Sequence, residues 1–570
     1  TYLFCFILFI SSLFVFNKES LYSPLKALAL GGVISSISVY LSPALFNLNL
    51  YFLNNSNNAG TFGNTTYAGL FLVFSIFSAL ILFFKEKDKI KKAPLWLLCT
   101  LIIFLCPIFL NTKGIFTGNL SGLLSFIGEA RAGFVSIVLG LLIALILYLY
   151  FDKRKTFSFV AKVSLVLTIF GSMWLTYGLF NNESRFHNLV VKSGEESRFI
   201  YWRMSTISIG QNPVMGIGLE NFPSIYQKYF DPILLSPGYP DGAWTDKPHN
   251  NILEIAYSGG LVGLMFYLSL VGFILISLIQ KVRTSESIER ATGALLFGLL
   301  TAYFFQLFFA FDTISSLPTF FITIALVSVF CFGEPKLTEK RYINKYLKIF
   351  FVVFFIILTF LMIYFFSWKV GQESKMLRKM NSIPVEERIS VFKNTITKSG
   401  AVGIATESQY IDLVVAKYKS NWSTYSLEIR AKVKKELEYL FEYSKQRSEE
   451  YPSDFRMALM SARIGNMLFD ISKVKQLEFL EVSKKYGARA VSNSPLNDMG
   501  YLTLAETFIL EGDLDRAMKF AEMAVNLNPI VPKFHNLVIY IARLKNSQRL
   551  IDEKIKEAKK YIPNYEYLVK

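Results

Sequence analysis

The chain has 570 residues, of which 52% are hydrophobic, and Phe alone occurs 54 times. A soluble domain of this size has too little interior to hide so much apolar surface, so a soluble globular protein is excluded. The formal charge of +17 does not indicate a nucleic-acid partner, because excess Lys and Arg in a polytopic membrane protein usually marks cytoplasmic loops.

Apolar runs of about 18–25 residues continue as far as Trp368, and each matches the roughly 20 helical residues that cross a bilayer core. The chain opens at Thr1 inside the first run, so we expect further residues to precede it. The sequence predicts an all-α protein with a polytopic membrane domain at 1–367 and a second helical domain at 368–570. We predict about ten spans, at 1–16, 25–46, 66–84, 93–110, 132–151, 157–180, 252–280, 291–311, 315–333 and 346–367.

The connecting segments alternate in charge along the chain. Segment 85–92 is rich in Lys, whereas 47–65 has neither Lys nor Arg and 111–131 has only Lys113 and Arg131. Short loops rich in Lys and Arg stay in the cytoplasm. We therefore predict a multi-pass protein of the bacterial cytoplasmic membrane whose long loop 181–250, like everything after residue 367, faces outside.

Residues 498–531 fit a tetratricopeptide repeat, a hairpin of two helices about 34 residues long. Small residues let the two helices approach, while Tyr501 and Phe508 fill the groove between them. Gly512-Asp513-Leu514-Asp515 formally matches the D-x-D metal–nucleotide motif, but Gly and Asp are also the usual residues of a turn and a helix N-cap, which is the interpretation we favour. We predict an outward-facing tetratricopeptide-like domain that binds a protein partner.

The chain has three histidines, His187, His249 and His535. Their separation and the lack of a Cys or acidic cluster argue against a zinc site. We expect His535 to be a surface or packing residue and His187 to be solvated. His249 closes a loop rich in Pro, Gly and aromatic residues just before a span, where an imidazole is suited to proton transfer. The alternative is that it caps or anchors the following helix.

Three arginines in the predicted outer segments are candidate anion ligands. Arg131 lies at the outer lip of a span, against the positive-inside trend, so it needs an anionic partner such as Glu129 or a ligand phosphate. Arg198 and Arg203 lie in the outer loop. There are alternatives to anion binding: Arg131 could reach a lipid headgroup, and Arg203 could be an exposed loop charge.

Several short segments between about residue 55 and residue 333 occur in a specific order and spacing. They are Gly60-Thr61-Phe62-Gly63-Asn64; Ala130-Arg131-Ala132-Gly133; Arg198 with Trp202; Pro213-Val214-Met215-Gly216-Ile217-Gly218-Leu219-Glu220-Asn221-Phe222; Pro248-His249-Asn250 with Leu253-Glu254; Gly259-Gly260-Leu261-Val262-Gly263; and Gln306. Together they resemble the O-antigen ligase and polymerase superfamily of bacterial membrane glycosyltransferases. The sequence departs from the family at Asn64-Thr65-Thr66, where a GTFGNPN-type segment is usual, and at Ala130-Arg131-Ala132, where an SRG-type segment is usual.

The resemblance implies that a glycan is transferred from a polyprenyl-pyrophosphate carrier to an acceptor hydroxyl on the outer face of the membrane. It assigns His249 as the general base for the acceptor proton, and Arg131 and Arg198 as ligands of the pyrophosphate. Pyrophosphate is already a good leaving group, so guanidinium groups are more important than a metal, and no metal or cofactor is expected. The expected substrate-binding residues are Arg131, Arg198, Arg203, Asn250 and Glu254.

The acceptor stays open: a lipid anchor for a ligase, a growing glycan for a polymerase, or a protein hydroxyl for an oligosaccharyltransferase. The expected partners are thus the lipid-linked donor, one of these acceptors, membrane lipids and a protein bound to the repeat domain. A transporter or flippase of lipid-linked glycans is an alternative of another class. It predicts ionisable residues near the middle of the spans, which here contain very few.

Overall fold

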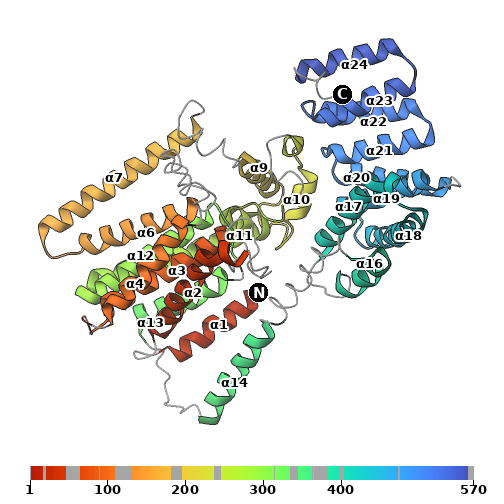
Figure 1. Cartoon of the computed structure of the whole chain (residues 1–570). Coiled ribbons are helices and arrows are strands. Elements are labelled where there is room, and N and C mark those ends of the chain that lie inside the picture. The colour runs from red at the N-terminus through yellow and green to blue at the C-terminus, as the bar shows by residue number, and fades with distance from the viewer. Residues whose placement is uncertain are drawn as a thin grey trace. The chain divides into compact units, whose positions relative to one another are not determined.

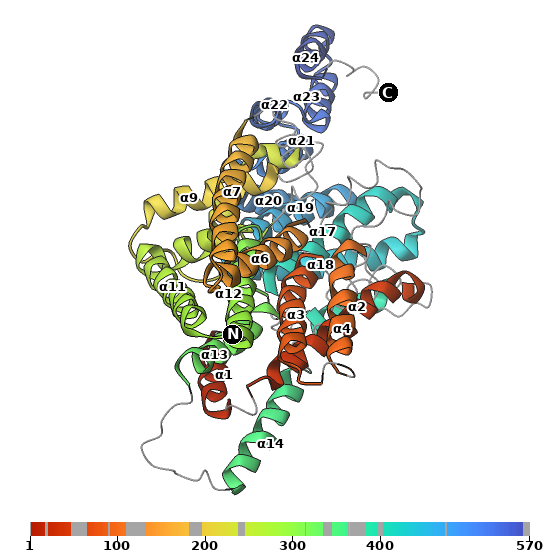
Figure 2. The same ribbon diagram turned by 90° about the vertical axis from the view of Figure 1, so that its left-hand side faces the viewer.

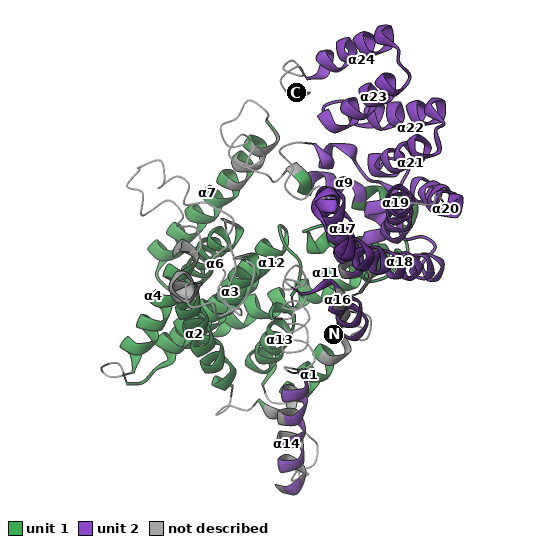
Figure 3. Cartoon of the chain, turned by 45° about the vertical axis from the view of Figure 1, so that its right-hand side comes forward, with its two compact units in different colours: residues 1–198, 205–220, 247–341 green, residues 199–204, 221–246, 342–570 purple. Residues whose placement is uncertain are grey.

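The computed structural model of the chain is all-helical over the residues that it describes (Figures 1 and 2). These residues are 2–16, 21–46, 65–88, 90, 92–109, 131–181, 196–236, 245–313, 315–333, 345–362, 364, 383–396, 403–472 and 476–562. The chain forms two compact units (Figure 3). The first comprises 1–198, 205–220 and 247–341, and the second comprises 199–204, 221–246 and 342–570.

Every predicted span falls on a helix. These helices are α1 (Tyr2–Val15), α2 (Ser23–Phe46), α3 (Thr65–Lys85), α4 (Ala93–Phe109), α6 (Arg131–Tyr150), α7 (Lys155–Phe180), α11 (Asn251–Thr284), α12 (Ser287–Leu307), α13 (Ser316–Phe332) and α14 (Lys345–Met362). Among the described residues, four helices are long and apolar enough to cross a membrane: α3, α6, α11 and α12. The helical class is confirmed, and the number of spans stays a prediction.

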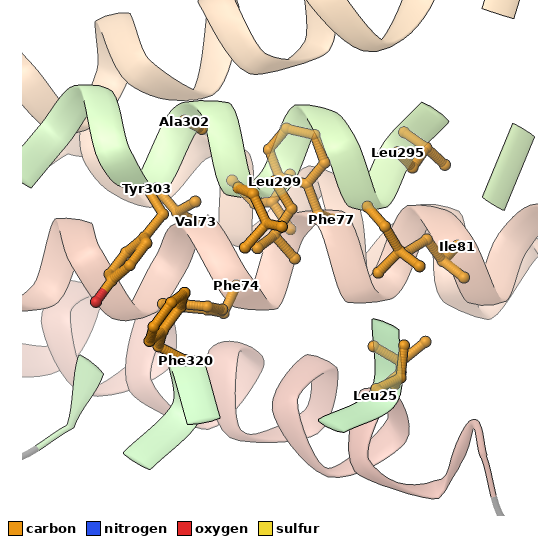
Figure 4. Packing of buried hydrophobic residues seen from close by; sticks show 14 of the residues in the cluster. Leu25, Val73, Phe74, Phe77, Ile81, Leu295, Leu299, Ala302, Tyr303 and Phe320 are labelled. Atoms are coloured by element: carbon orange, nitrogen blue, oxygen red, sulfur yellow. The ribbon is translucent and has the colours of Figure 1, made fainter. Parts of the chain in front are cut away.

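Helix α3 is apolar on all sides and forms the centre of the first unit, where it contacts α2, α4, α6, α12 and α13. Its side chains Phe74 and Phe77 are fully buried, and Figure 4 shows them among residues of α12 and α13. Helix α6 runs alongside both α7 and α12 (Figures 1 and 2). The α6 and α12 backbones meet at Gly140 and Gly298, because a Cβ atom on Gly140 would lie 2.4 Å from the Gly298 carbonyl oxygen. Such small-residue contacts are typical of membrane helices.

The second unit contains a series of helices that pack in chain order, which we call the C-terminal array (α17–α24). Its helices are α17 (Gly403–Asn421), α18 (Leu427–Glu450), α19 (Phe455–Ile471), α20 (Leu477–Asn493), α21 (Asp498–Glu511), α22 (Leu514–Leu527), α23 (Pro532–Leu544) and α24 (Gln548–Tyr561), with α16 (Val385–Val391), η7 (Phe392–Ile396) and η8 (Trp422–Thr424) as shorter elements. The predicted hairpin 498–531 is the pair α21–α22, and Phe508 stacks on Phe520 with ring centroids 5.4 Å apart. The helix pair is confirmed, and its tetratricopeptide class stays a prediction.

The D-x-D segment has the structural role that we favoured. Gly512 ends α21 with φ 91°, and the Asp513 carboxylate caps α22 by accepting from the Arg516 backbone N–H at 2.9 Å. Asp515 pairs with Lys545. The expectation for His535 is likewise confirmed, because the ring is buried and its Nε2 donates to the Pro529 carbonyl at 2.8 Å.

Asp498, at the start of α21, is fully buried, and burial raises its pKa from the ordinary 3.8 to about 7. Because its pKa is higher in the folded chain than in the unfolded chain, ionisation of Asp498 opposes folding as the pH rises from about 4 to about 7. We expect Asp498→Asn to raise the melting temperature by roughly 5 °C above pH 7 and to leave it unchanged near pH 4. Thermal unfolding of the full chain in detergent across this pH range measures the difference. A gain that is equal at both ends of the range would contradict the prediction.

Candidate active site

The segment Pro248-His249-Asn250 leads directly into α11. Asn250 is buried and is the N-cap residue of this helix, because its side-chain oxygen accepts from the Leu253 backbone N–H at 3.0 Å. Asn250 therefore caps α11, and the position of His249 is not explained by a role as the cap of this helix.

His249 is held by its own loop in one orientation. Its backbone is left-handed, with φ 56°, and its ring Nδ1 donates to the Lys247 carbonyl at 3.1 Å. The ring also packs edge-on against Phe311, with centroids 5.2 Å apart. A neutral imidazole protonated on Nδ1 carries its lone pair on Nε2, which is therefore the atom that can accept a proton.

The Lys247 ammonium group links Glu220, which follows the 213–218 motif, to Glu254 in the first turn of α11. The Nζ atom is 2.8 Å from a Glu220 carboxylate oxygen and also donates to Glu254. Burial lowers the pKa of Lys247, but Glu254 and Glu220 outweigh this effect and the net shift is upward. Lys247 therefore stays charged, and the Glu254 carboxylate, which we expected at the substrate, is bound to it.

Sequence reasoning missed Asp312, which follows Phe311 in the turn between α12 and α13. Its carboxylate accepts hydrogen bonds from the Tyr303 hydroxyl and, at 3.0 Å, from the Ser316 hydroxyl. Burial raises the pKa of Asp312 to about 6, and the nearby Glu254 carboxylate adds to the shift. Asp312 is the only charged residue between 291 and 333, a signal that could have marked it as functional.

The two candidate arginines of the loop 181–250, Arg198 and Arg203, lie on α9 (Glu196–Gln211), whose residues 199–204 belong to the second unit. Arg198 is half-buried in the first turn. Arg203 forms an ion pair with Asp231, whose carboxylate also caps the short helix η4 (Pro232–Leu235). The guanidinium of Arg203 thus already has an anionic partner within the chain.

Arg131 is the first residue of α6. In the following turn of α6, the Ser136 hydroxyl donates to the side chain of Gln306 of α12 at 3.5 Å, and this side chain also donates to the Thr66 carbonyl of α3 at 3.3 Å. A Cβ atom on Gly133 would lie 3.3 Å from the Gly69 Cα, so α3 and α6 approach closely here.

Several predicted features lie outside the described residues: the Arg131 side chain, the segments 60–64, 128–130 and 237–244, and His187. The structure places His249 and Glu254 in contact with Lys247, makes Asn250 the N-cap of α11, and pairs Arg203 with Asp231. The meeting of His249 with Arg131 and Arg198 stays a prediction.

The motif at 213–218 is explained by a break in α11. Gly260 has φ 64° and ψ −167°, so the helix loses its own hydrogen bonds at this point. The motif replaces them with four backbone bonds: Ile217 N to Tyr257 O (2.9 Å), Gly218 N to Ser258 O (2.9 Å), Leu261 N to Pro213 O (2.7 Å) and Val262 N to Val214 O (3.3 Å). Backbone groups freed within an apolar helix need such partners. The glycine-rich motif is therefore a backbone support for the helix that begins after His249.

Comparison with known proteins gives one match. Residues 116–268 match the family model described as O-antigen ligase, a segment that contains Arg131, Arg198, His249 and the paired motif at 213–218. No curated protein and no solved structure matches the chain. Over residues 116–268 the chain is thus similar to the O-antigen ligase family, and four of its described helices are long and apolar enough to cross a membrane.

Proposed function

We propose that the chain transfers a glycan from a polyprenyl-pyrophosphate carrier to an acceptor hydroxyl at the outer face of the cytoplasmic membrane. One observation carries the proposal: His249 lies in the family-matched segment, and the Lys247 carbonyl holds its ring so that Nε2 is the proton acceptor. In this proposal the loop 181–250 and the domain 368–570 face outside, as the charge of the loops predicts.

The reaction follows from these groups. His249 Nε2 takes the proton of the acceptor hydroxyl as its oxygen attacks the anomeric carbon of the donor. The bond from that carbon to the pyrophosphate oxygen breaks, and the leaving carrier keeps the electron pair. Arg131 and Arg198 stabilise the charge that develops on it. Asn250, Glu254 and Arg203 then contribute by keeping the loop in place.

The direct experiment uses purified full-length chain in liposomes with a polyprenyl-pyrophosphate-linked oligosaccharide and candidate acceptors. We expect release of polyprenyl pyrophosphate together with glycosylated acceptor. A lipid anchor, a second glycan or a protein as the productive acceptor distinguishes ligase, polymerase and oligosaccharyltransferase. Movement of intact donor across the bilayer without cleavage would instead identify a flippase.

We expect Arg131→Ala and Arg198→Ala each to lower the transfer rate by about 10²–10³-fold, because each removes a cationic group from the departing pyrophosphate. Arg131→Lys and Arg198→Lys keep the charge but lose the two-pronged hydrogen bond, and we expect partial activity. Arg283→Ala, in the last turn of α11, is the matched control. Activity of both alanine variants equal to that of the control would contradict the proposed role.

We also expect full activity in excess chelator, since the two guanidinium groups supply the positive charge. Transfer assays with and without EDTA measure this directly. Strict dependence on an added divalent cation would indicate a different class of enzyme.

A further inference from the structure

The C-terminal array has one edge that is occupied by the chain's own outer loop. Within the second unit, residues 221–236 form α10 (Phe222–Lys228) and η4, and they bond to the array at three places. The bonds are Phe455 N to Gln227 Oε1 (3.2 Å), Ser494 Oγ to Gln227 O (2.7 Å), Asn528 Nδ2 to Pro232 O (2.6 Å) and Ser236 Oγ to Asn528 Oδ1 (3.1 Å). Gln227, Ser236, Ser494 and Asn528 are all buried.

The three places lie at the turns between successive helix pairs. Phe455 is the first residue of α19, after the turn from α18, while Ser494 and Asn528 are the C-cap residues of α20 and α22. Each lies where the second helix of one pair turns into the first helix of the next. Residues 221–236 therefore follow a single edge of the array, with one bond at each of the first two turns and two bonds at the third. Such a regular, buried set of partners is a built interface.

The same loop is packed against α9. The ring of Tyr201 contacts those of Tyr226 and Phe222, with centroids 6.1 and 6.4 Å apart, and all three side chains are buried. The Arg203–Asp231 ion pair adds a second link. Helix α9 also carries Arg198, so the array is connected through α10 to the helix of a proposed pyrophosphate ligand.

The ends of the docked segment lie next to the proposed base. The segment begins after Glu220 and ends before Lys247, and these two residues form an ion pair of 2.8 Å. The Lys247 carbonyl in turn holds the His249 ring. The described part of the segment, residues 221–236, is bound to the array, and the ion pair joins the residues that flank the segment.

We propose that the C-terminal array holds residues 221–236 in their working conformation, with Gln227 and Asn528 as positioning residues that act along the chain on Arg198 and His249. This role rests on the proposed function. The turn edge of the array is then an internal interface, and a protein partner of the array would bind elsewhere on it.

Asn528→Ala tests the proposal, because it removes both bonds to Pro232 and Ser236. Asn526→Ala is the control, since Asn526 is exposed on the same helix. The first readout is hydrogen exchange of residues 221–236 in the full chain, which does not depend on activity. We expect about 10- to 100-fold faster exchange for Asn528→Ala and no change for Asn526→Ala. Unchanged exchange in Asn528→Ala would overturn the docking.

The second readout is transfer kinetics with the lipid-linked donor. We expect KM to rise about tenfold in Asn528→Ala with a smaller change in kcat, because the chemical groups are intact but less well placed. Faster exchange with unchanged kinetics would overturn the positioning role.

A second pair of variants guards against misfolding of Asn528→Ala. Ser494→Ala removes only the bond to the Gln227 carbonyl, and Ser492→Ala changes an exposed serine of the same helix. We expect faster exchange of the loop in the first variant alone. An inactive wild-type chain whose loop is protected as described would refute the proposed function and the positioning role while leaving the docking itself supported.

Discussion

We expect His249→Ala to lower glycan transfer by about 10²–10⁴-fold while the protein still inserts and folds. The acceptor hydroxyl is a weak nucleophile, and in the proposed mechanism the Nε2 atom of His249 is the group that takes its proton. The ring is only half-buried and caps no helix, so its loss costs little packing. Initial rates of polyprenyl-pyrophosphate release, normalised to the amount of monodisperse protein, measure the effect.

His249→Asn distinguishes loss of the imidazole base from strain in the backbone at residue 249. The left-handed φ of 56° is strained for Ala, whereas Asn adopts it more readily. We therefore expect His249→Asn to be as stable as the wild type and as inactive as His249→Ala. Full activity of the Asn variant with a pyrophosphate-linked donor would remove His249 from the mechanism.

Gly260→Ala should prevent the folded protein from accumulating. An added Cβ atom would lie 2.1 Å from the Val214 carbonyl oxygen and 2.3 Å from its carbon, and both are backbone atoms that cannot rotate away. The φ of 64° adds strain. The bonds of the 213–218 motif would be lost together, and we expect a destabilisation of about 4 kcal/mol or more. The yield of monodisperse protein and its melting temperature in detergent measure it.

Gly259→Ala is a matched control one residue earlier. A Cβ atom there meets nothing within 4 Å, so we expect near wild-type yield. Gly216→Ala, on the opposite side of the pairing, would place its Cβ 2.4 Å from the Tyr257 carbonyl oxygen and should behave like Gly260→Ala. Equal behaviour of the 259 and 260 variants would show that this backbone pairing does not form.

The helices of the membrane region are readable from sequence because their signal is local. A run of apolar residues long enough to span a bilayer specifies a helix whatever surrounds it, and α3, α6, α11 and α12 fall on such runs. The turn between α21 and α22 is local too, since Gly512 and Asp513 supply the left-handed residue and the N-cap themselves. For His249 the local pattern predicted a functional residue at the start of a helix, but not what orients its ring.

Partners that are distant in sequence could not be predicted in this way. From the sequence, Asp312 is an ordinary turn residue. In the structure its carboxylate is buried, and the preceding residue, Phe311, packs against His249. Arg203 reads as a loop charge or a phosphate ligand, and only the structure supplies Asp231. The sequence does not show why glycine stands at 216 and 260. The structure explains both positions by the close pairing of the two backbone segments.

The sequence alone thus determined a helical membrane protein, a histidine before one helix and a helical domain after the spans, because apolar length, loop charge and turn residues act over a few neighbours. The tertiary structure decided that the 213–218 motif supports a break in α11, that Lys247 joins both ends of the loop, and that the array binds residues 221–236. Each of these depends on groups that become neighbours only when distant segments come together, from the 27 positions between Glu220 and Lys247 to the 296 between Pro232 and Asn528.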